Sequence, residues 1–156
     1  PKSENKHYGF NSAFLFPGIL KHHSLKLDFS YQFLNGEYYT FPLFVNYPRG
    51  FFNYNTNNDI FKYTADYRLP VLYPDANIAG FMYIKRIKAS LFCDYANAVS
   101  YKYGKYEFLS SGTELTFDVI PVRAMMPLGI GCRYIYLHTF KKHAFELIMS
   151  LNFDSF

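Results

Sequence analysis

The residue types best suited to chemistry in this sequence are two adjacent histidines, two cysteines and a serine pair. His22 and His23 suggest a metal site, but neighbours in a strand point to opposite faces, so an interfacial position is favoured. Cys93 and Cys132 show no metal-ligand spacing and fit small apolar strand residues better. The segment Ser110–Gly112 lacks the Gly-x-Ser-x-Gly elbow of a serine hydrolase. We therefore expect no enzyme, no metal and no cofactor.

Ion pairing is the other chemistry that the residue types suggest. Charged side chains stand at alternate positions of otherwise apolar segments, so they share one face of the predicted strands. This set is Asp66, Arg68, Arg86, Asp94, Glu114, Asp118, Arg133 and Glu146. Guanidinium and carboxylate groups on one wall can form charge-assisted hydrogen bonds. The plain alternative is that these residues only line a wet interior.

The elements that position these residues are predicted strands, because apolar and polar residues alternate with a period of two over segments of about ten residues or more. Seven segments show the pattern: His7–Phe16, Ser24–Phe33, Phe61–Pro70, Arg86–Tyr95, Tyr106–Ile120, Arg123–Leu137 and His143 to the carboxy terminus. A very tight turn at Pro121–Val122 is expected between the fifth and sixth segments. The last three segments exceed the usual length of soluble strands.

Composition favours a membrane over water as the surroundings of these strands. Half of the 156 residues are hydrophobic, and 18 Phe and 16 Tyr are too many for the interior of a soluble domain of this size. No apolar stretch approaches the roughly 18 to 20 residues of a spanning helix, and a closed β-barrel is the other fold that pairs every backbone group in hydrocarbon. The sequence therefore predicts an all-β, antiparallel transmembrane β-barrel in a bacterial outer membrane.

Parity assigns one face of each strand to the lipid bilayer, which is the first expected partner. The predicted lipid-facing set is Leu25, Leu27, Phe29, Leu91, Cys93, Leu115, Phe117, Leu128, Ile130, Leu147, Met149 and Leu151. The formal charge of +4 does not change this prediction, because the basic residues form no patch of the kind that binds nucleic acid. No nucleic-acid partner is expected.

One long connection, residues 35–58, separates the second and third predicted strands. It is rich in Asn, Tyr, Gly and Pro and contains Pro48-Arg49-Gly50-Phe51. Outer-membrane barrels have short periplasmic turns and longer outside loops, so this loop is expected to be extracellular.

Arg49, Gly50 and Phe51, followed by five predicted strands, resemble the BamA and TamA superfamily of outer-membrane assembly and secretion barrels, the bacterial surface antigen family. The segment Met126–Gly129 also resembles the proline- and glycine-bearing part of that family's penultimate strand. The resemblance implies that the loop folds into the barrel lumen. There, Arg49 would meet Asp66 and Asp94 on the next two strands.

The resemblance also implies a function and further partners. Residues 1–156 would be the carboxy-terminal portion of one barrel domain and supply the last seven strands of a 16-stranded barrel. Such barrels insert outer-membrane proteins or translocate polypeptides. The implied partners are client polypeptides, accessory lipoproteins and the amino-terminal strands of the same barrel.

A second hypothesis is a self-contained eight-stranded barrel with a structural or adhesive role at the cell surface. The length suits such a barrel, and Thr40–Val45 would serve as its eighth strand.

Overall fold

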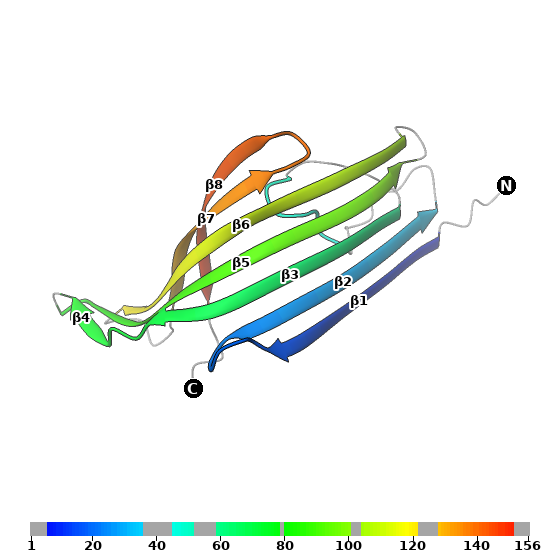
Figure 1. Ribbon diagram of the computed structural model, residues 1–156. Helices are drawn as coiled ribbons and strands as arrows, with labels where there is room; N and C mark the ends of the chain where they lie inside the picture. Colours follow the sequence, from blue (N-terminus) through cyan, green and yellow to red (C-terminus); the bar gives the residue numbers. More distant parts are fainter. Residues whose placement is uncertain are drawn as a thin grey trace.

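The computed structural model describes residues 6–35, 45–51, 59–78, 80–100, 104–121 and 128–151. Its regular elements are eight strands: β1 (Lys6–Pro17), β2 (Ser24–Asn35), β3 (Asp59–Leu72), β4 (Ala76–Ile78), β5 (Met82–Ser100), β6 (Gly104–Pro121), β7 (Leu128–Leu137) and β8 (Lys142–Leu151). They form one antiparallel sheet in the order β1-β2-β3-β5-β6-β7-β8, with β4 paired to β5 (Figure 1). Each strand on this path follows its neighbour in the chain, with only β4 intervening between β3 and β5.

The seven strands on the path correspond to the seven segments predicted from alternation. The short strand β4 was not predicted, because three residues are too few to show a period of two. Within the described residues the sheet is open, since β1 and β8 stand at its two ends. No helix in this part of the chain is long and apolar enough to cross a membrane.

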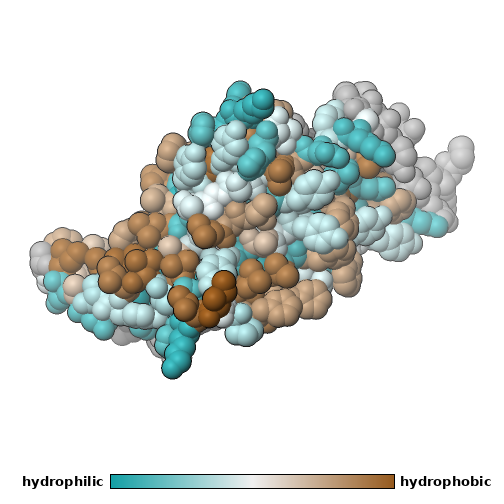
Figure 2. Space-filling view, in the orientation of Figure 1, coloured by the Kyte–Doolittle hydropathy of each residue, from teal (hydrophilic) through white to brown (hydrophobic). Residues whose placement is uncertain are grey.

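The strand register places the apolar alternate residues on one side of the sheet, which we call the outer face. Leu25, Tyr67 and Leu91 form one cross-strand row on it, and the row continues through Thr113 and Tyr134. The register places all the predicted lipid-facing residues on this face. The structure does not describe the side chain of Leu151, which is placed by its backbone position alone. Apolar side chains gather along this face (Figure 2). The outer face therefore carries large apolar groups that no other part of the described chain covers.

The opposite side, the inner face, is apolar at one end and polar at the other. At the apolar end the loop segment Val45–Phe51 lies against the strands. The buried cluster there consists of Val45, Phe51, Ile60, Phe92, Ala96, Ala98, Phe108, Ile135 and Leu137. Toward the other end lies an open hollow of about 700 Å³, and charged side chains including Lys26, Arg68, Arg86, Lys88 and Glu114 line it.

Several local expectations need correction or fall outside the described residues. His22 and His23 lie in the β1–β2 turn rather than in a strand, and His22 has a φ of 67°. The ladder of β6 and β7 ends at Val119 and Leu128. Residues 122–127 lie outside the described residues. Three expectations fall wholly or partly on them: the turn at residues 121–122, the strand start at residue 123 and the segment 126–127. Residues 40–44 of the proposed eighth strand also lie outside the described residues.

Candidate functional site: a loop segment bound across the inner face

The loop enters the inner face through a tight turn at Pro48-Arg49-Gly50-Phe51. The Phe51 amide donates a hydrogen bond to the Pro48 carbonyl at 3.1 Å, and Gly50 has a φ of 83°, as the third residue of a type II turn requires. A Cβ atom at Gly50 would also lie 2.8 Å from Leu137 Cδ2 on β7. Glycine is therefore needed for the backbone conformation and for the close approach to β7.

The segment Val45–Phe51, which we call the strap, crosses the strands. Every second residue is hydrogen-bonded to an inward side chain on successive strands β2, β3 and β5. The three bonds join Val45 N to Gln32 Oε1 (3.2 Å), Lys62 Nζ to Tyr47 O (3.4 Å) and Arg49 N to Asp94 Oδ2 (3.0 Å). Beyond them, the Phe51 ring lies 4.9 Å from Phe108 on β6. The strap thus joins side chains from β2 to β6.

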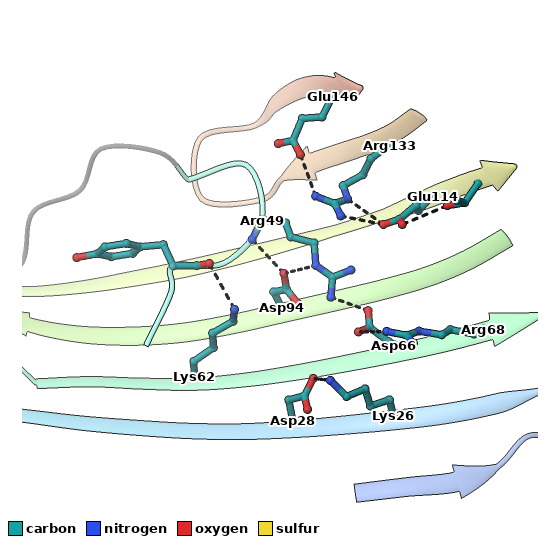
Figure 3. A network of polar contacts seen from close by, with 12 residues as sticks. Lys26, Asp28, Arg49, Lys62, Asp66, Arg68, Asp94, Glu114, Arg133 and Glu146 are labelled. Atoms are coloured by element: carbon teal, nitrogen blue, oxygen red, sulfur yellow. Dashed lines mark hydrogen bonds and ion pairs between the residues drawn. The ribbon is translucent and has the colours of Figure 1, made fainter. Parts of the chain in front are cut away.

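Arg49 forms the centre of the site and lies between two acids from neighbouring strands (Figure 3). Its Nη2 is 2.6 Å from Asp66 Oδ1 on β3, and its Nε is 3.2 Å from Asp94 Oδ2 on β5. The guanidinium carbon also lies 4.1 Å from the centre of the Phe92 ring, a cation–π distance. The structure therefore brings together the three residues that the resemblance pairs.

Burial makes this ion pairing asymmetric. The Asp94 side chain is fully buried, whereas that of Arg49 is 19 % exposed. Asp94 Oδ2 accepts from both the backbone and the side chain of Arg49, and Oδ1 is buried without a hydrogen-bond partner among the described residues. A buried carboxylate is costly unless it is paired and hydrogen-bonded. Arg49 therefore supplies both the backbone hydrogen bond and the ion pair that Asp94 Oδ2 makes.

Phe92 joins the Arg49 pair to a second cluster of charges. Its ring is 4 % exposed and faces Gly112 across the β5–β6 ladder. A Cβ atom at Gly112 would lie 2.7 Å from Phe92 Cζ, so glycine leaves the room that the ring occupies. Arg133, on β7, has its guanidinium carbon 5.9 Å from the centre of the same ring. One aromatic ring therefore contacts two of the inward arginines, Arg49 and Arg133.

The second cluster is a row of alternating charges across β6, β7 and β8. Glu114, Arg133 and Glu146 are direct cross-strand neighbours. Arg133 donates to Glu114 Oε2 from Nε at 3.0 Å and to Glu146 Oε2 from Nη1 at 2.9 Å (Figure 3). Opposite charges on facing positions stabilise strand pairing. This row attaches β8 to its neighbours on the inner face.

Of the remaining predicted inward charges, Arg68 and Arg86 line the open hollow. Asp118 pairs with Arg86 and, at 2.8 Å, with Lys88 Nζ. Arg68 is mostly exposed and lies 3.8 Å from Asp66 Oδ2. All eight predicted charged residues therefore face inward, but they form separate clusters rather than one continuous wall.

The sequence did not predict the residues that bind the strap outside the Arg49-Gly50-Phe51 motif. Gln32 and Lys62 were read only as polar members of an alternating strand. Phe92 stands at a polar-phase position between Ser90 and Asp94, and this break in the alternation was a signal that a large ring fills the interior.

The possible metal ligands give no metal-binding arrangement in the described ranges. No three His, Cys, Asp or Glu residues within them lie close enough to hold a metal ion. Cys93 and Cys132 are free thiols and exposed, and their register places them on the outer face. His23 Nδ1 lies 2.8 Å from the Tyr67 hydroxyl, which fixes the β1–β2 turn against β3.

Comparison with known proteins assigns neither a family nor a function to this site. No family model, no curated protein and no solved structure matches the chain.

Proposed function

We propose that this chain is the carboxy-terminal part of a transmembrane β-barrel of a bacterial outer membrane, and that the barrel inserts outer-membrane proteins or translocates polypeptides. The observation that carries the proposal is the strap. A loop motif, Arg49-Gly50-Phe51, reaches the inner face and pairs with acids on two successive strands, Asp66 and Asp94. This is the arrangement that the resemblance to the assembly and secretion barrels implies.

The apolar outer face and the open sheet support the membrane part of the proposal. Large apolar side chains on that face need an apolar partner, which a bilayer supplies. In hydrocarbon a sheet cannot keep a free edge, because each unpaired backbone group is costly. The edges of β1 and β8 must then be covered by further strands, which in the proposed 16-stranded barrel precede this segment.

The strap supports the assembly part. A barrel that admits a client strand between its first and last strands gives up the backbone pairing at that seam. Contacts inside the barrel must then maintain the curvature of the sheet. The strap supplies such contacts, because it joins β2, β3, β5 and β6 without using backbone pairing between strands. The seam strand on this side is β8, attached through Glu146 to Arg133.

The test is an assembly assay with the full-length protein in lipid vesicles. A urea-unfolded eight-stranded outer-membrane protein should fold faster into these vesicles than into empty ones. Arg49→Ala should remove most of the acceleration, and Arg68→Ala, which changes a mostly exposed arginine on the same face, should keep it. An inert barrel would contradict the proposal and favour the structural or adhesive alternative.

The membrane orientation of the outer face gives a separate prediction. Leu91→Arg places a charge on that face and should cost about 2 to 4 kcal/mol of stability if the site lies near the bilayer midplane. The Ser90 side chain lines the polar hollow, so Ser90→Arg should cost much less stability. Urea unfolding of the full-length protein in lipid measures both variants, and equal costs would contradict the assignment of the faces.

A further inference from the structure

The open hollow on the inner face has more cations than acids in its wall. Three ion pairs have both members in this wall, at nitrogen–oxygen distances of 2.6 to 2.9 Å: Lys26–Asp28, Arg49–Asp66 and Arg133–Glu114. Among the described residues the same wall holds no further Asp or Glu, but it holds four further cations: Lys62, Arg68, Arg86 and Lys88. The surface that a solute in the hollow meets is therefore positively charged.

The acid that pairs with Arg86 and Lys88 lies behind them. Asp118 pairs with Arg86 Nε and, at 2.8 Å, with Lys88 Nζ. Its side chain is 3 % exposed, whereas those of Arg86 and Lys88 are 38 % and 35 % exposed. One recessed carboxylate thus serves two cations that reach the hollow, and it leaves one positive charge unbalanced.

Arg68 adds a second accessible positive charge. Its side chain is 57 % exposed, and its Nη2 lies 3.8 Å from Asp66 Oδ2. The other oxygen of Asp66 is held by Arg49 at 2.6 Å (Figure 3). An ion pair as long and as exposed as that of Arg68 is weak. Asp66 is therefore mainly the partner of Arg49.

The strand register gathers these three cations beside Ser90, which also lines the hollow. Arg68 on β3 is the direct cross-strand neighbour of Ser90. Lys88 and Arg86 precede Ser90 by two and four residues on the same face of β5. Direct cross-strand neighbours have Cβ atoms about 5 Å apart, and alternate residues of a strand are about 7 Å apart. We call Arg68, Arg86 and Lys88 the cationic recess.

We propose that the cationic recess attracts small anions and repels small cations, so that this part of the hollow selects anionic solutes. A concave wall whose accessible charges have one sign concentrates counter-ions, because low-dielectric surroundings focus its field. The inference rests on the proposed function only in taking the hollow to be part of a barrel lumen. It adds the charge of the solutes that this lumen admits.

The test places a thiol in the recess and compares two reagents of opposite charge. The full-length protein in lipid carries Ser90→Cys and, to remove the nearest native thiol, Cys93→Ala. It reacts with a methanethiosulfonate that bears a sulfonate or with one that bears a trimethylammonium group. Mass spectrometry of the peptide containing residue 90 gives each rate, which is divided by the rate of the same reagent with a free thiol. The sulfonate reagent should react faster by on the order of tenfold.

The variant Arg68→Gln/Lys88→Gln, made in that parent protein, should lower the ratio of the two rates by on the order of tenfold. Each removed cation leaves its acid with another partner, since Asp66 keeps Arg49 and Asp118 keeps Arg86. The fold should therefore persist. The charge-retaining variant Arg68→Lys/Lys88→Arg should keep the ratio of the parent protein.

The matched control is Lys21→Gln/Lys85→Gln, which removes two exposed lysines that do not line the hollow and should leave the ratio unchanged. Three results would overturn the inference: equal or faster reaction of the cationic reagent with the parent protein, a thiol that neither reagent reaches, or an unchanged ratio in the Gln double variant of the recess. An assembly-inert barrel with the anion preference would refute only the proposed function, and an active barrel without it would refute only this inference.

Discussion

Arg49→Ala should lower the free energy of unfolding by about 3 kcal/mol, at the low end of the range for breaking a buried ion pair, because the guanidinium is partly exposed. The loss leaves the fully buried Asp94 without the side chain that balances its charge, and its Oδ1 atom already lacks a hydrogen bond within the described part of the chain. Urea unfolding of the full-length protein in lipid measures this change.

Two further variants separate the charge of Arg49 from its geometry. Arg49→Lys should recover only part of the stability, because an ammonium group cannot bond two carboxylates on different strands in the way a planar guanidinium does. Arg68→Ala should change stability little, since the Arg68 side chain is 57 % exposed and lies 3.8 Å from its acid. Full stability of Arg49→Ala would show that the strap is held by its other contacts alone.

Phe92→Ala should cost about 3 to 5 kcal/mol, as expected for deleting a large buried ring. The surrounding groups cannot close the space easily, because Gly112 has no side chain and the Arg49 guanidinium is held by its two acids. The variant should also weaken the strap, since the ring contacts Arg49 directly. Proteolysis within the loop, followed over time, would report that weakening.

The control for Phe92→Ala is the same substitution at the preceding residue, Leu91. Leu91→Ala removes apolar atoms from the outer face, where the side chain is half exposed, and should cost about 1 kcal/mol. Similar costs at the two positions would contradict the role of Phe92 as an interior contact between Arg49 and Arg133.

The main strands and their faces were predictable because alternation is a local signal. Asp66 and Asp94 could be placed inward from parity alone, and the register confirms that placement. The pairing of Arg49 with these acids was expected only through the resemblance, since a period of two in strands does not determine where a loop goes.

The contacts that hold the rest of the strap depend on the sheet as a whole. The fit of Phe92 to Gly112 depends on which residues of β5 and β6 face each other, and no single segment contains that information. The bond from Val45 to Gln32 is likewise set by where the loop lies on the sheet. The strand β4 was missed for a different reason, because three residues are too short a segment to establish a period.

The strap has a consequence for the order in which the chain acquires its structure. Phe51 contacts Phe108 and Phe140, and Gly50 approaches Leu137, all of which follow the strap by several strands. A chain made from its amino terminus therefore contains the strap before it contains the residues that hold it. Contacts between residues distant in sequence form late, because their loop-closure entropy must be overcome first. A chain truncated before β7 would thus keep the Arg49 acids and the contact between Phe51 and Phe108, but it would lose the contacts of the strap with Leu137 and Phe140. The strap should therefore become fully packed only when the final hairpin is present.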